Sequence, residues 1–105
     1  MITATFTESG EKLSLRIEGH AEYAEHGKDI VCASASILAC TLATMIESFG
    51  IKSNINLEIG DTTIECECNE HPMMDVIRDA FNFANWGYTL LAQNYPQYVR
   101  LNALT

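Results

Sequence analysis

The sequence predicts a single α+β domain in which one mostly antiparallel sheet packs with two helices. Short segments that alternate polar and apolar residues occur in pairs around glycine-containing turns. Two longer segments place apolar residues at helical spacing. The expected order is therefore strand, strand, helix, strand, strand, helix, strand (ββαββαβ). A length of 105 residues suits one domain, so we expect residues 1–105 to fold as a unit.

The first two strands are expected at Ile2–Thr7 and Leu13–Glu18. The linker between them contains Gly10 and has the length of a hairpin loop, which favours an antiparallel pair. Apolar and polar residues alternate along the second strand, so one face of the sheet should be buried. His20 follows just beyond this strand. Residues 21–28 combine charges and a glycine without a sustained period, which is typical of a loop.

The first helix is expected to begin after Asp29, a suitable N-cap residue, and to run to about Phe49. Gly50 follows, as is common just past a helix end. Residues 30–46 contain no charged side chain, so nearly every side of this helix needs cover. The sheet can cover one side, and a second helix or a partner subunit must cover another. The run falls short of a membrane span, so we expect no membrane contact.

A second hairpin is expected from Asn54–Ile59 and Thr62–Cys68, with its turn at Gly60 and Asp61. Apolar residues and glutamates alternate along its second strand, so one face should again be buried. The strand–strand–helix order then repeats.

The second helix is expected to open at His71-Pro72, with the proline at a tolerated first position, and to end at Tyr95-Pro96. A final strand is expected at Gln97–Leu101. One side of the helix carries an apolar stripe at helical spacing: Met73, Ile77, Phe81, Ala84, Tyr88 and Leu91.

The composition narrows the possible partners. The net charge is −8, from 14 acidic and 6 basic residues, which argues against direct nucleic-acid binding. An acidic surface suits a basic partner, and it also favours solubility. No charged segment followed by an apolar core opens the sequence, so we expect no signal peptide and a cytoplasmic protein with reduced thiols.

His20 and Cys32 are candidates for a catalytic pair, because a thiol and an imidazole are the minimum parts of a cysteine nucleophile and its base. Cys32 is expected in the first helical turn, where the helix dipole favours a thiolate over a thiol. The alternative is that Cys32 is a small buried hydrophobe. Asp29 can cap the helix or steer the imidazole. Ser36 lies one turn beyond Cys32 and can donate to the thiolate or to His20, or bond back to the Cys32 carbonyl. A backbone N–H of this turn is also a candidate for holding an oxyanion.

The other reactive or aromatic residues have simpler interpretations. Cys66 and Cys68 with nearby His71 suggest a metal site, but cysteines two apart in a strand share a core face equally well, so we expect no metal and no cofactor. Cys40 is expected to pack inside, and His26 to be a solvated loop residue. Three aromatic residues are interpreted as core or dimer contacts: Phe81, Phe83 and Trp86.

The stretch Gly19-His20-Ala21, with Gly27, Asp29-Ile30-Val31-Cys32-Ala33 and Ser36, resembles the signature of the ribosomal-processing cysteine protease family, called Prp. The similarity continues in residues 90–92 and 95–99 and covers nearly the whole chain. Ser34 departs from the family, which more often has alanine there, and residues 51–70 carry no recognisable family signature.

The resemblance implies a homodimeric cysteine endopeptidase that removes a short N-terminal extension from large-subunit ribosomal protein twenty-seven. Carried over by position, Cys32 is the nucleophile, His20 is the general base, and Asp29 and Ser36 support them. The family's cut falls behind an aromatic pair, which implies an apolar cleft. The segment that would gate the substrate includes Ala21, Glu22, Tyr23, Gly27 and Lys28. The alternatives are a protease acting on phage capsid or scaffold proteins, a non-catalytic dimeric module binding ribosomal or phage proteins, and a redox-sensing thiol.

Overall fold

The computed structural model describes residues 1–10, 12–25, 27–67 and 72–104. The elements follow the predicted ββαββαβ order. Their bounds are β1 Ile2–Ser9, β2 Lys12–Glu18, α1 Ile30–Ser48, β3 Ser53–Glu58, β4 Asp61–Glu67, α2 Met74–Asn94 and β5 Val99–Leu104. The five strands form one sheet in the order β3-β4-β2-β1-β5. All neighbouring pairs are antiparallel except β1 and β5, which confirms a mostly antiparallel α+β fold.

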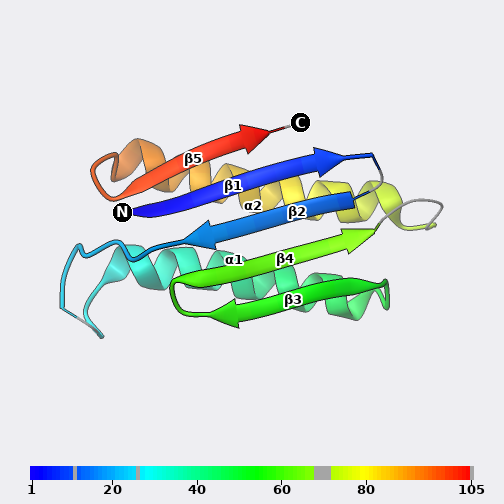
Figure 1. The fold of residues 1–105 in the computed structure, drawn as a ribbon, viewed down its shortest axis with the longest axis horizontal. Helices are drawn as coiled ribbons and strands as arrows, with labels where there is room; N and C mark the ends of the chain where they lie inside the picture. The colour runs from blue at the N-terminus through cyan, green and yellow to red at the C-terminus, as the bar shows by residue number, and fades with distance from the viewer. Residues whose placement is uncertain (11, 26, 68–71, 105) are drawn as a thin grey trace.

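Both helices cover the same face of the sheet, with α1 behind β3 and β4 and α2 behind β1 and β5 (Figure 1). The core lies between these layers. In β2, Leu13, Leu15 and Ile17 are buried as the alternation predicts, and Ile64 and Cys66 of β4 are buried beside them. Cys68 lies outside the described residues. The opposite face of the sheet carries polar residues and faces solvent.

The helix α1 begins and ends close to the predicted positions, with Asp29 as its N-cap and Phe49 as its C-cap. The chain itself covers this helix only in part, because Ile37 is 62% exposed and Met45 is 38% exposed, and cover by a partner subunit stays a prediction. Cys40, expected to pack inside, is exposed as well. By length and composition alone this helix could span a membrane. Residues such as Val31 and Ile46 on one side of this helix pack into the core of the domain.

The helix α2 begins at Met74, later than predicted, because its first helical hydrogen bond runs from the Ile77 N–H to the Met73 carbonyl. Pro72 lies in the preceding turn, and His71 lies outside the described residues. The apolar stripe is confirmed by the buried residues Ile77, Phe81, Ala84, Tyr88 and Leu91, whereas Met73 is 39% exposed.

The last strand and the second hairpin differ from the prediction by a few residues. Tyr98 and Val99 both donate backbone bonds to the Tyr95 carbonyl, which makes residues 95–98 a turn and delays β5 to Val99. Asp61 pairs with Glu58 across the hairpin, so the turn between β3 and β4 consists of Ile59 and Gly60, not Gly60 and Asp61. Gly60 has a φ of +84°, a conformation that glycine adopts without steric cost.

Candidate active site at the start of α1

Three chain segments meet at one end of the sheet, on the left in Figure 1. β2 ends there and is followed by His20, α1 begins there with Cys32 in its first turn, and the β3–β4 turn closes the same end. His20 and Cys32, separated in the sequence by the loop, line the same two cavities. The structure therefore brings the predicted thiol and imidazole together at one site.

Cys32 is partly buried, and its Sγ accepts a hydrogen bond of 3.4 Å from the backbone N–H of Ala21. Ala21 is itself buried, so this donor is fixed beside the sulfur. The sulfur lies in the first turn of α1, and the side chain of the cap residue Asp29 also contacts the Cys32 side chain.

Asp29 holds the helix start and the loop together. One carboxylate oxygen accepts from the N–H groups of Val31 and Cys32 at 3.0 and 2.9 Å, and the other accepts from Tyr23 and Ala24 at 2.9 and 3.4 Å. Burial raises the pKa of Asp29, but the bonds from the Cys32, Tyr23 and Ala24 N–H groups, together with a side-chain contact to Cys32, outweigh it and bring the pKa below its ordinary value. Of the two roles considered for Asp29, capping is the one that these contacts describe.

Three N–H groups of the first turn of α1 already have acceptors within the chain. Val31 and Cys32 donate to the Asp29 side chain, and Ala33 donates to the Asp29 carbonyl at 3.0 Å. The structure therefore gives no support for these three groups as oxyanion donors, and an oxyanion donor in the first turn stays a prediction. Their bonds are used for capping, which a side-chain acceptor at the N-cap position achieves in many helices.

Two hollows adjoin the Cys32 thiol. The larger has a volume of 530 Å³ and is lined partly by the loop residues Glu22, Gly27 and Lys28. The smaller has a volume of 80 Å³ and extends between α1 and the β3–β4 hairpin, with mainly apolar walls. Ser36 is exposed and lines both. Ser34, the departure from the family pattern, bonds back to the Ile30 carbonyl at 2.7 Å.

The sequence interpretation missed the β3–β4 hairpin as part of this site. Ile59 lines both hollows, and Leu57 and Gly60 line the smaller one. Ile59 is 79% exposed although it is apolar. An isoleucine beside a glycine at a hairpin turn was the available signal, since such a turn is normally polar.

Tyr23 holds the loop against the turn that follows the C-terminus of α2. Its ring packs edge-on against Tyr95 and Tyr98, with centroid distances of 5.5 and 5.2 Å. His26 lies outside the described residues. Within the described part of the chain, no three His, Cys, Asp or Glu side chains are grouped to hold a metal ion.

Enzymes with a cysteine nucleophile use a thiol and an imidazole that line the same cleft. The chain belongs to the family described as cysteine protease Prp, whose family model matches residues 1–100. This membership places it among the cysteine proteases. A segment of 38 residues is 50% identical to the ribosomal processing cysteine protease Prp of Bacillus subtilis (strain 168). That segment spans 34% of each protein.

Two solved structures are similar over nearly the whole chain. A crystal structure of the ribosomal processing protease Prp from S. aureus, in complex with a covalently linked product peptide, has 26% identity and a TM-score of 0.84. It is matched over 98% of this chain and 99% of that chain. The crystal structure of SMU.848 from Streptococcus mutans has 28% identity and a TM-score of 0.72, with 100% and 95% of the two chains covered.

Proposed function

We propose that this protein is an endopeptidase that removes a short N-terminal extension from large-subunit ribosomal protein twenty-seven. The observation that carries the proposal is the placement of Cys32 and His20 on shared cavities, with the Ala21 N–H donated to the sulfur. The names of the relatives support ribosomal processing, and the S. aureus structure, which contains a covalently linked product peptide, supports peptide cleavage.

In the proposed mechanism His20 takes the Cys32 proton, and the thiolate attacks the scissile carbonyl. The resulting tetrahedral intermediate collapses when His20 returns the proton to the leaving amine, which gives a thioester and releases one peptide. Water, deprotonated by His20, then attacks the thioester carbonyl. The C–S bond breaks, His20 returns the proton to the Cys32 sulfur, and the second peptide leaves with a new carboxyl terminus. Asp29 acts through the backbone, since its bonds fix the first turn that carries Cys32.

We assign substrate entry to the larger hollow and gating to the loop of residues 21–28. The size of this hollow suits a peptide segment better than the smaller one does. Gly27 and Lys28 lie on its wall, and the loop is tied down at Tyr23 by ring contacts and by Asp29. Release of these contacts would reshape the hollow around a substrate.

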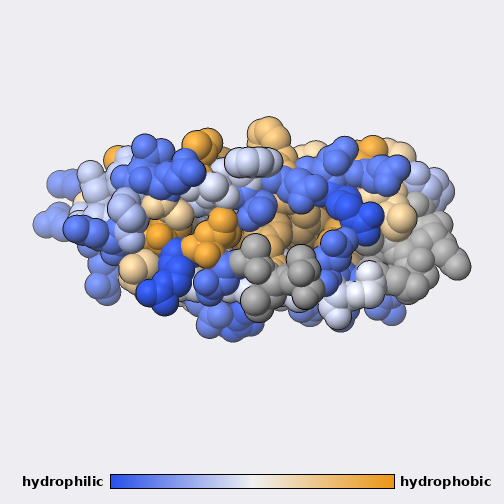
Figure 2. Space-filling view, turned by 90° about the horizontal axis from the view of Figure 1, so that it is seen from above, coloured by the Kyte–Doolittle hydropathy of each residue, from blue (hydrophilic) through white to orange (hydrophobic). Residues whose placement is uncertain are grey.

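We further propose a homodimer in the cytoplasm. Support comes from the solvent-facing side of α2, where the side chains of Phe83, Trp86 and Leu90 are 73%, 70% and 56% exposed. Apolar patches also reach the surface in Figure 2. Large exposed apolar patches mark interaction sites, and a second copy would supply the cover that the uncharged α1 lacks. The net charge of −8 suits a basic ribosomal protein and gives no support to nucleic-acid binding.

The test is cleavage of the extended ribosomal protein by purified enzyme, read by mass spectrometry. The expected result is removal of the extension by wild type and no removal by Cys32→Ala or Cys32→Ser. Ser34→Ala is the matched control on the same helical turn and should retain activity, because Ser34 only bonds back to Ile30. Cleavage by both Cys32 variants at the wild-type rate would refute the mechanism. An intact extension with wild type, beside cleavage of a phage capsid or scaffold protein, would refute the substrate.

A further inference from the structure

The turn between β3 and β4 lies directly against the His20 ring. A side-chain Cβ placed at Gly60 would be 2.8 Å from His20 Nε2 and 3.0 Å from His20 Cε1. Ordinary van der Waals contact begins near 3.4 Å, so the ring occupies the space that any other residue at this position would need. His20 is exposed, and this turn therefore provides one wall against which an otherwise mobile side chain rests.

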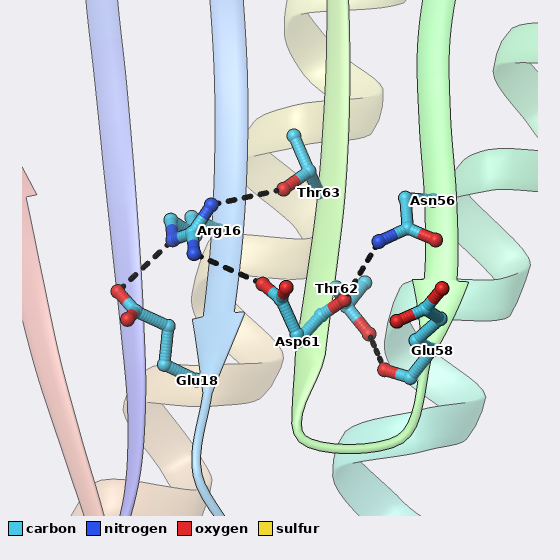
Figure 3. Close-up of polar contacts among 7 residues, drawn as sticks. All are labelled: Arg16, Glu18, Asn56, Glu58, Asp61, Thr62 and Thr63. Atoms are coloured by element: carbon cyan, nitrogen blue, oxygen red, sulfur yellow. Dashed lines mark hydrogen bonds and ion pairs between the residues drawn. The ribbon is translucent and has the colours of Figure 1, made fainter.

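The turn is held in place relative to His20 by bonds to the end of β2. The N–H of Gly19, the residue before His20, donates to the Gly60 carbonyl at 3.0 Å. Figure 3 shows that Arg16 reaches both Asp61, next to Gly60, and Glu18, next to Gly19. The two ion pairs measure 2.9 and 3.1 Å.

The hairpin also braces its own turn. The Thr62 hydroxyl donates to the Glu58 carbonyl at 3.1 Å, and the Asn56 amide donates to the Asp61 carbonyl at 3.1 Å (Figure 3). A side chain added at Gly60 would therefore meet a fixed backbone on one side and a rotatable ring on the other. The ring yields more readily, because turning a side chain disturbs fewer contacts than moving a paired hairpin.

We propose that Gly60 is a positioning residue for His20: the absence of a side chain at the β3–β4 turn sets the orientation of the imidazole in the site that it shares with Cys32. This inference rests on the proposed function, since it concerns the same pair. It adds a residue from the part of the sequence that shows no family signature. Displacing a reacting group by about 1 Å lowers rates by about 100-fold, so even a small rotation of the ring is measurable.

A matched pair of substitutions separates ring displacement from backbone strain. Gly10 occupies the turn of the other hairpin, at the opposite end of the sheet, and also has a positive φ of +59°. A Cβ at Gly10 would meet no atom within 4 Å. Asparagine adopts positive φ more easily than other non-glycine residues, so Gly60→Asn and Gly10→Asn should both fold.

The experiment compares wild type, Gly60→Asn and Gly10→Asn by thermal unfolding, by the NMR signals of the His20 ring and by steady-state cleavage of an extension peptide. The expected result is that Gly60→Asn shifts the ring signals and lowers kcat by about ten-fold or more, with KM within about two-fold. Gly10→Asn should match wild type in the His20 ring signals and in kcat.

Unchanged ring signals and kcat in Gly60→Asn would overturn the inference. Equal losses of kcat in the two variants would also overturn it, because they would indicate a purely structural effect. If wild type cleaves no peptide, the proposed function fails, and the ring signals alone decide the role of Gly60. A shift of the His20 ring signals in Gly60→Asn but not in Gly10→Asn would still support the positioning role of Gly60.

Discussion

Replacing Asp29 by asparagine or by alanine separates its two tasks. The two carboxylate oxygens serve different partners, one capping α1 through Val31 and Cys32 and the other holding the loop through Tyr23 and Ala24. Asparagine has one acceptor oxygen, which is expected to remain with the two short cap bonds. Its NH₂ group would then face the loop N–H groups and cannot accept from them. Alanine loses both functions.

The expected magnitudes follow from these contacts. Losing an N-cap costs about 1 kcal/mol, and as much as about 2 kcal/mol in some proteins. Losing the loop bonds costs about 1 kcal/mol locally, because water replaces part of each bond. The lost cap alone should lower the Tm of Asp29→Ala by roughly 4–8 °C for a domain of this size, and Asp29→Asn, which keeps the cap, should lose less than half as much. In Asp29→Asn the Tyr23 amide should exchange with solvent about five-fold faster.

Thermal unfolding and amide hydrogen exchange measure the two effects separately. The matched control is Ser34→Ala, which changes the same helical segment without touching the cap or the loop. If Asp29→Asn is as unstable as Asp29→Ala, the division of labour between the two oxygens is wrong. If the Tyr23 amide exchanges at the wild-type rate in Asp29→Asn, the carboxylate does not hold the loop.

Three further predictions concern stability and assembly. The pKa of Asp29 in the folded protein lies below the ordinary value of 3.8, so Asp29 stabilises the fold above pH 3.8, and this stabilisation is lost as the pH falls through the lower folded pKa. Unfolding curves of Asp29→Asn should lack this pH-dependent stabilisation. Equal acid sensitivity of wild type and Asp29→Asn would contradict the prediction. Tyr88→Phe should cost about 1 kcal/mol in urea unfolding, since the buried hydroxyl donates to the Ala35 carbonyl at 2.7 Å, and an unchanged free energy of unfolding would show that this bond contributes nothing. Burial, and secondarily Cys40, raises the pKa of Tyr88 and keeps that donor protonated. A Phe83→Ser/Trp86→Ser double variant should shift the mass in solution from dimer to monomer by light scattering; a monomeric wild type would refute the dimer.

Local patterns were enough to predict most of the fold. The alternation in β2 and the helical spacing in α2 depend only on which side of an element is buried. Asp29 was identifiable as a cap because its position and chemistry suffice without tertiary context. The start of α2 at Met74 was not predictable in this way, because proline is tolerated at several positions near a helix start. The structure sets the start by the first helical hydrogen bond, which the Met73 carbonyl accepts.

The site was only half predictable, because one wall depends on the strand order. His20 and Cys32 lie on either side of a short loop, whereas Gly60 reaches them only because β4 pairs with β2. No local pattern encodes that pairing. Cys40 was misjudged for a related reason: an uncharged helix indicates a need for cover, but the chain supplies that cover on part of its surface only.

If Cys32 is the nucleophile, its thiol should react faster than an ordinary cysteine, and alkylation rates resolved by site test this most directly. Cys40 is the internal reference, since it lies on the same helix and is more exposed than the partly buried Cys32. At neutral pH, iodoacetamide should modify Cys32 at least about ten-fold faster than Cys40, and His20→Ala should slow only Cys32. Modification of Cys32 at the same rate as Cys40, or more slowly, would contradict the account.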